Sequence, residues 1–200
     1  LTVVDCGINH DFLAGLPAGT QRPGLLVRKV AGGEQGTMDS SRQVAMTAAQ
    51  CQQALQNGKD IVRGLPGNAL LLGEMGIGNT SPASMLLSRL AGLDIEVCTG
   101  AGTGLDAPAV QRKTAVLREV LALHAQASAP LDALAAFGGY EIATMVGAVL
   151  QAAQERRVVL VDGFIATAAV LVAHALQPLV LQRCVFAHRS GERGHEFMLQ

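Results

Sequence analysis

A glycine-rich segment with one carboxylate, Gly73-Glu-Met-Gly-Ile-Gly-Asn79, closes an apolar run of strand length at residues 69–75. A strand that leads through glycines into a helix N-terminus presents free backbone N–H groups and a positive helix end, which suit a phosphate. The segment is not a Walker loop, because no Gly-Lys-Ser/Thr follows, and its spacing is not a dinucleotide fingerprint. Taken alone, such a segment is a structural turn about as often as an anion site.

Glu74 and Asn79 are the polar members of this segment. A carboxylate beside an anion site would repel the anion, so Glu74 would face ribose hydroxyls or an azole N–H. The alternative is that Glu74 caps nearby backbone amides, as acidic groups at helix starts often do. Asn79 is predicted to be the N-cap of a helix over residues 81–91.

A second glycine-rich loop, at residues 99–106, precedes another predicted helix. Asp106 can cap this helix, and Lys113 lies about two turns further along it. Lys113 could supply a point charge for a phosphate. The alternative is a solvated lysine on a helix face that also carries Arg112, which is the commoner situation for a lysine.

Asp162, His188 and Ser190 allow a competing hydrolase hypothesis. Asp162 and His188 at adjacent strand ends could orient each other, with Ser190 or Ser81 as the nucleophile. No G-x-S-x-G elbow is present, so a structural histidine and a turn-capping aspartate are the favoured interpretation.

Metal and disulfide chemistry are not indicated. The pairs His10 with Asp11 and Glu192 with His195 match no zinc-binding pattern. The cysteines lie far apart and form no C-x-x-C pair, which fits a reduced cytoplasmic compartment; they are Cys6, Cys51, Cys98 and Cys184. We expect no metal and no cofactor.

These residues must be positioned by alternating strands and helices. Strands are predicted at residues 1–8, 24–30, 69–75, 158–162 and 179–186, and helices at 42–56 (starting near Ser40 or Thr47), 81–91, 107–124, 140–154 and 165–175. Apolar strands separated by helices indicate an α/β, Rossmann-like parallel sheet with helices on both faces. Ligands of such sheets bind at the carboxyl ends of strands, where the glycine-rich and polar segments fall.

Composition narrows the function classes. The 200 residues are 50% hydrophobic, 16% charged and 3% aromatic, with a formal net charge of −1. That balance suits one folded domain over residues 1–200 and argues against nucleic-acid binding. Apolar runs fall short of the ~20 residues of a membrane span. The chain opens in a strand and closes in a predicted helix, so we expect a fragment of a longer chain.

Several motifs together resemble the nicotinate-nucleotide:dimethylbenzimidazole phosphoribosyltransferase family of cobalamin biosynthesis. The segment from Gly73 to Thr80 looks like the family's GE-x-G-x-x-NT signature. Further similar segments follow in the family's order, and they are Gly102–Asp106 with Lys113, Gly138–Ile142, Val161–Phe164, and Ala187–Ser190 with Glu192 and Gly194. Upstream, Val4–Gly7 and Ala45–Thr47 also fit, so the resemblance covers nearly the whole chain.

The resemblance implies a pentosyltransferase that moves the ribose phosphate of nicotinate mononucleotide onto dimethylbenzimidazole, giving α-ribazole phosphate and nicotinate. It also implies a homodimer and a small helical domain that is largely absent here. The alternative is a truncated, non-catalytic homologue that only binds the mononucleotide.

By the same resemblance, Gly76, Gly78 and Lys113 would hold the phosphate, and Asn79 would support the first loop. Glu74 would lie near the ribose and the base. The other expected substrate-binding residues are Gly102, Gly139, Asp162 and Ser190. The family's general base is a glutamate in a C-terminal segment beyond residue 200, so Glu74 is the carboxylate nominated here for catalysis.

Overall fold

Parallel strands form two small sheets in the computed structural model, which describes residues 1–17, 19–102, 104–187 and 189–200. One sheet pairs β1 (Val3–Asp5) with β2 (Leu25–Val27), and the other has the order β3 (Ala69–Leu72), β4 (Val158–Val161), β5 (Cys184–Phe186). The predicted α/β class with parallel strands is confirmed. The first two strands, however, pair with each other and not with the last three.

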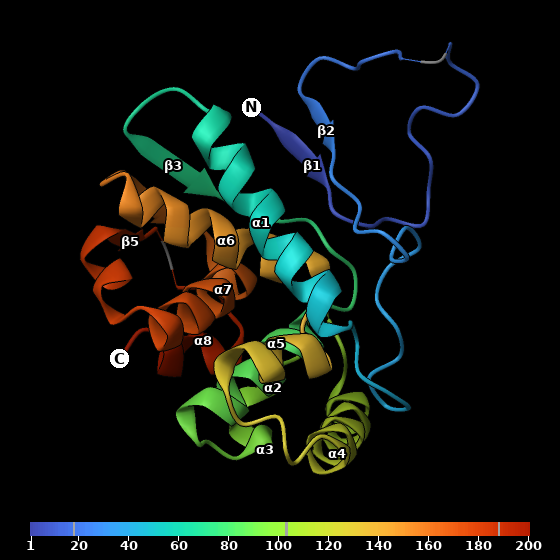
Figure 1. The fold of residues 1–200 in the computed structure, drawn as a ribbon. Helices are drawn as coiled ribbons and strands as arrows, with labels where there is room; N and C mark the ends of the chain where they lie inside the picture. The colour runs from blue at the N-terminus through green and yellow to red at the C-terminus, as the bar shows by residue number, and fades with distance from the viewer. Residues whose placement is uncertain (18, 103, 188) are drawn as a thin grey trace.

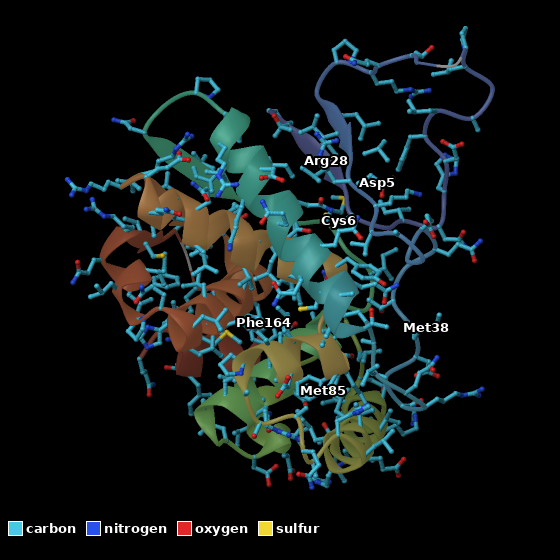
Figure 2. The ribbon with its side chains drawn as sticks, in the orientation of Figure 1. Asp5, Cys6, Arg28, Met38, Met85 and Phe164 are labelled. Carbon is cyan, nitrogen blue, oxygen red and sulfur yellow. The ribbon has the colours of Figure 1, made fainter. Side chains whose placement is uncertain are left out.

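Helices make up most of the rest of the described chain. They are α1 (Ala48–Gly64), α2 (Thr80–Ala91), α3 (Ile95–Cys98), α4 (Ala107–Leu123), α5 (Pro130–Phe137), α6 (Tyr140–Gln154), α7 (Gly163–Leu176), the 3-10 helix η1 (Pro178–Arg183) and α8 (Arg193–Met198). Figure 1 shows α1 crossing in front of α6, with α2 to α5 gathered at the end of the molecule away from β3. The side chains of Met85 and Phe164 lie inside this helical body (Figure 2).

Two glycines let α1 and α6 approach closely. A Cβ on Gly58 would lie 1.9 Å from the Thr144 carbonyl oxygen, and one on Gly147 would lie 1.9 Å from the Leu55 carbonyl oxygen. Each helix therefore packs its backbone directly against the other. Only glycine fits at these two positions, so this contact fixes the position of α6 relative to α1.

The three-stranded sheet is buried on one side. Leu70, Leu72, Val159 and Val161 are at most 9% exposed. On the opposite face of the sheet, Leu71 pairs with Leu160, and Leu160 pairs with Val185. There Leu71 is 72% exposed and Val185 is 51% exposed. Apolar side chains on that side therefore remain uncovered in this chain.

The helix predicted at residues 42–56 begins later, at Ala48, and runs to Gly64. Thr47 is its N-cap, with a complete capping box to Gln50, so of the two predicted starts Ser40 is wrong. The preceding backbone bonds elsewhere, because the Ala45 and Met46 N–H groups donate to carbonyls at the end of α5. A tertiary contact therefore displaces the start of the helix.

The strand predicted at residues 179–186 is only half correct. Pro178 opens η1, and the strand itself begins at Cys184. Short apolar runs do not distinguish a strand from a tight helix by periodicity. The short helices α3 and α5 were not predicted at all.

The ends of β3 and β4 meet, as the sheet rule predicts. A Cβ on Gly73 would lie 4.0 Å from Asp162 Oδ2. The end of β1 joins them from the other sheet, because a Cβ on Gly7 would lie 3.2 Å from the Tyr140 ring at the start of α6. Figure 2 shows Asp5 and Cys6 at this end of β1. The glycine-rich segments therefore converge on one region.

Candidate functional site

The first glycine-rich loop holds Glu74 in place through Asn79. Asn79 Nδ2 donates to Glu74 Oε2 at 2.6 Å. Gly76 lies against this bond, since a Cβ there would be 2.2 Å from Asn79 Nδ2. Asn79 is the N-cap residue of α2, as predicted, but its side chain makes no capping bond. Its amide instead orients the Glu74 carboxylate, so the contact that Glu74 makes here is to a side chain and not to a backbone amide.

A second carboxylate, that of Glu141, contacts the same Asn79 amide as Glu74. Asn79 Nδ2 is also 3.4 Å from Glu141 Oε1, in the first turn of α6. A Cβ on Gly139 would lie 2.6 Å from both Glu141 oxygens, so Gly139 makes room for this carboxylate. Burial raises the pKa of Glu141, and the Glu74 charge acts in the same direction against two hydrogen bonds that lower it. The sequence predicted Gly139 as a site residue but not Glu141, for which the signal was a carboxylate shortly after two glycines.

Lys113 reaches back from α4 to the start of α2. Its Nζ donates to Thr80 Oγ1 at 2.9 Å. Gly102 lies against the same pair, with a Cβ position 3.3 Å from Thr80 Oγ1 and 3.8 Å from Lys113 Nζ. Burial lowers the pKa of Lys113, and the Glu192 carboxylate opposes this change. Lys113 is thus half-buried at the junction of the two loops and does not lie on the solvated face that Arg112 occupies.

The start of α4 fixes the end of the second loop. Asp106 Oδ1 accepts a hydrogen bond from the Ala109 N–H at 2.8 Å, which confirms the predicted cap of α4. Gly78 and Gly102 have φ values of 81° and 58°, a region that side chains other than glycine rarely adopt. Glycine is therefore required for the turn at these two positions.

Ser190 pairs with His195. The Ser190 N–H donates to His195 Nδ1 at 2.9 Å, so this nitrogen carries no proton and Nε2 donates to Thr167 Oγ1, also at 2.9 Å. Thr167 in turn donates to the Gly163 carbonyl at 2.7 Å. His195 is fully buried. This buried chain of hydrogen bonds fixes the loop that carries Ser190.

The hydrolase hypothesis receives no support from this arrangement. His188 lies outside the described residues, and the described ring that contacts Ser190 belongs to His195. On the far side of that ring, Nε2 bonds to the Thr167 hydroxyl, at the place where a catalytic triad would have a carboxylate. Asp162 lies beside Gly73, at the end of β4.

Two exposed apolar side chains flank Gly76 in the first loop. Met75 is 97% exposed and Ile77 is 104% exposed. They stand next to Glu74, so one loop combines a fixed carboxylate with apolar surface. That combination suits a flat aromatic ring with a polar edge.

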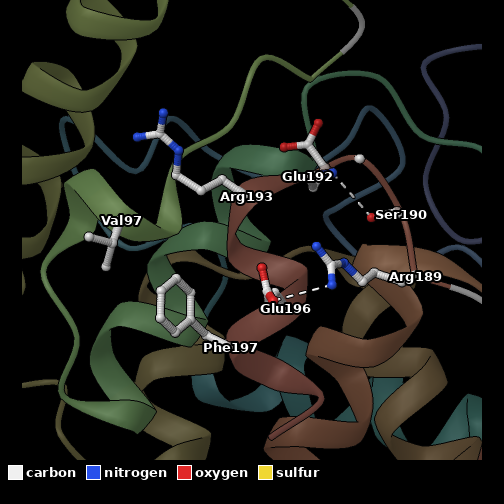
Figure 3. Close-up of a pocket in the computed structure, with 8 residues that line it drawn as sticks. Val97, Arg189, Ser190, Glu192, Arg193, Glu196 and Phe197 are labelled. Carbon is white, nitrogen blue, oxygen red and sulfur yellow. Dashed lines mark hydrogen bonds and ion pairs between the residues drawn. The ribbon is translucent and has the colours of Figure 1, made fainter.

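An open pocket of about 370 Å³ lies beside the Ser190 loop. Its lining residues are Val97, Arg189, Ser190, Gly191, Glu192, Arg193, Glu196 and Phe197. Arg189 forms an ion pair with Glu196 at 3.2 Å across it (Figure 3). Lys113, Thr80 and Gly102 form a separate cradle that does not line this pocket. Glu192 lines the pocket, and its charge also acts on Lys113.

The described part of the chain offers neither a metal site nor a membrane span. No group of three or more His, Cys, Asp or Glu side chains there could hold a metal ion. No helix in that part is long and apolar enough to cross a membrane. All four cysteines are free thiols.

Comparisons with known proteins show the family to which this chain belongs. A family profile described as "Phosphoribosyltransferase" matches residues 1–200. The nicotinate-nucleotide–dimethylbenzimidazole phosphoribosyltransferase of Variovorax paradoxus (strain S110) is 67% identical over 200 residues, covering 100% of this chain and 54% of that protein. The protein of the same name from Janthinobacterium sp. (strain Marseille) is 48% identical over 202 residues, covering 100% of this chain and 56% of that protein.

A solved structure shares the fold. The crystal structure of the enzyme of that name from Thermus thermophilus superposes with a TM-score of 0.86 at 30% identity, covering 99% of this chain and 56% of that one. The chain therefore spans about half the length of the relatives that it matches.

Proposed function

Because this chain belongs to the phosphoribosyltransferase family of the nicotinate-nucleotide–dimethylbenzimidazole type, we propose that it transfers the ribose phosphate of nicotinate mononucleotide to dimethylbenzimidazole. The bond from C1′ to the pyridine nitrogen breaks and releases nicotinate. A bond from C1′ to an azole nitrogen forms, and the azole loses its N–H proton. The product is α-ribazole phosphate, which serves in assembly of the nucleotide loop of cobalamin.

The observation that carries the proposal is the cradle of Lys113, Thr80 and Gly102. It places an ammonium, a hydroxyl and the N-terminus of a twelve-residue helix at one point between two glycine-rich loops. These groups together suit a phosphate monoester. Binding the phosphate there would hold the attached sugar in register for attack at C1′.

Glu74 is the carboxylate in reach of the reacting base in this proposal. Asn79 occupies Oε2, which leaves Oε1 to accept the azole N–H proton. Met75 and Ile77 would cover the faces of the flat aromatic base. Gly76 and Gly139 keep the space that the two carboxylates need. Gly78, Asp162 and Ser190 complete the proposed substrate contacts.

The remaining parts of the proposal concern the whole protein. Residues 1–200 would form its nucleotide-binding core, and the protein would act as a cytoplasmic homodimer. The exposed apolar row of Leu71 and Val185 supports further burial, either by other segments or by a second copy. The free thiols are consistent with a reducing compartment.

The test is incubation of the protein, as encoded in full, with nicotinate mononucleotide and dimethylbenzimidazole, with chromatographic detection of nicotinate and α-ribazole phosphate. We expect both products in equal amounts. Tight binding of the mononucleotide without turnover would favour the non-catalytic homologue, and hydrolysis to nicotinate and ribose phosphate alone would contradict the transferase.

A further inference from the structure

We infer that Glu192 binds the ribose 2′- and 3′-hydroxyls of the mononucleotide, an inference that rests on the function proposed above. It divides the work between two carboxylates, with Glu74 at the base and Glu192 at the sugar. Two features of the Glu192 side chain support this role: a buried oxygen without a donor, and a position beside the second glycine-rich loop.

The Glu192 carboxylate has an oxygen without a structural partner. Within the described residues, Oε2 is buried and no hydrogen-bond donor reaches it. Glu192 is the N-cap residue of α8, yet its side chain makes no capping bond. None of the ion pairs formed by the described residues involves it. A buried carboxylate oxygen without a donor is costly, so a bound ligand that supplies one would be favoured.

Glu192 also lies at the cradle. A Cβ on Gly100 would be 2.1 Å from Glu192 Oε2, so the second glycine-rich loop is shaped around this carboxylate. The Glu192 charge acts on Lys113, and the Glu192 N–H donates to Ser190 Oγ at 3.4 Å. In Figure 3 the carboxylate points away from the ion pair of Arg189 with Glu196. It therefore faces the loop that carries Gly102.

A ribose phosphate presents two kinds of group a few ångströms apart. The phosphate requires a cation and N–H donors, while the cis-diol requires an acceptor, and a carboxylate can accept both hydroxyls. A negative charge beside Lys113 would weaken binding of bare phosphate but would favour a phosphate that carries a diol. Glu192 is thus a specificity determinant that rejects phosphates lacking the sugar hydroxyls.

The test compares the binding of ribose 5-phosphate, nicotinate mononucleotide and inorganic phosphate by calorimetry, using the protein as encoded in full. Glu192→Gln should weaken both sugar phosphates by roughly tenfold, a common loss for a charge-assisted hydrogen bond. Inorganic phosphate should bind equally well or more tightly. Glu196→Gln is the matched control, because it removes the same charge from an exposed glutamate of α8 and should leave all three affinities within about twofold.

Glu192→Asp keeps the charge but withdraws the carboxylate, so it should also weaken the sugar phosphates while inorganic phosphate is unaffected. Equal loss for all three ligands in Glu192→Gln would overturn the inference, because Glu192 would then act only through Lys113. Unchanged binding of the sugar phosphates would overturn it as well. If the unaltered protein binds neither sugar phosphate, the proposed function itself has failed, which is a distinct result.

Discussion

The position of Lys113 at the junction of the two glycine-rich loops favours phosphate binding over the role of a solvated lysine. In the sequence, a lysine beside Arg112 fits a solvated helix face as well as a phosphate ligand. In the structure, its Nζ lies 2.9 Å from Thr80 Oγ1 and next to Gly102, while Arg112 is exposed. Glu74 differs from Lys113, because its contact with Asn79 orients the carboxylate without distinguishing the ribose hydroxyls from the azole N–H as its partner.

Replacing Lys113 with alanine should weaken binding of nicotinate mononucleotide by about 1–3 kcal/mol, or roughly 5- to 150-fold, since a charge-assisted contact to phosphate is lost. Arg112→Ala removes an exposed cation one residue away and should change the affinity by less than about twofold. Titration calorimetry measures both. Equal affinities for the two variants would count against the phosphate assignment.

Glu141 makes stability depend on pH. Burial raises its pKa above the ordinary value of 4.5, so the folded state binds this proton more tightly than the unfolded state does. The resulting stabilisation is complete below pH 4.5 and is lost as the pH rises through the raised folded pKa. Glu141→Gln does not titrate. The free energy of unfolding of the Glu141→Gln variant, minus that of the unaltered protein, should therefore increase with pH.

Urea unfolding at several values between about pH 4.5 and 8 measures this difference, with Glu119→Gln, an exposed glutamate of α4, as the control. Parallel stability profiles for Glu141→Gln and the unaltered protein would show that Glu141 does not contribute to the pH dependence.

Helices with local start and stop signals were predictable, and those set by tertiary contacts were not. The prediction of a helix at 140–154 matches α6 because two glycines precede it, and α4 matches because Asp106 caps it. The start of α1 was wrong because residues 45 and 46 bond to the end of α5. The pairing of Ser190 with His195 and the role of Asn79 as a bridge depend on loop conformation, which no periodicity encodes.

The close contact between α1 and α6 should make the protein's stability sensitive to a side chain at Gly147. Gly147→Ala would place a methyl group 1.9 Å from the Leu55 carbonyl oxygen, so the helices must separate. We expect a loss of about 2–3 kcal/mol or more in the free energy of unfolding. Gly64→Ala, at the open end of α1, meets nothing within 4 Å and should be neutral or stabilising by up to about 1 kcal/mol. Thermal melts that shift equally would refute this account of the helix contact.

The molecule as a whole brings together loops that are far apart in the sequence. The ends of β3 and β5 lead into the loops that carry Glu74 and Glu192, because parallel strands deliver their carboxyl ends to the same edge. Lys113 reaches the start of α2 from α4. The sequence was enough to predict that the glycine-rich segments gather at this edge of the sheet, and to recognise the family. It did not indicate that β1 and β2 pair separately, because strand pairing is set by the packing of the whole chain. The exposure of Leu71 and Val185 on one side of the sheet likewise depends on how the whole chain packs.

In the proposed complex, the phosphate of the mononucleotide is bound between the two glycine-rich loops. A crystal structure of the protein, as encoded in full, with nicotinate mononucleotide bound tests it most directly. We predict phosphate oxygens within hydrogen-bond distance of Lys113 Nζ and of the backbone around Gly102. A phosphate bound away from both loops, with Lys113 still bonded only to Thr80, would contradict the account.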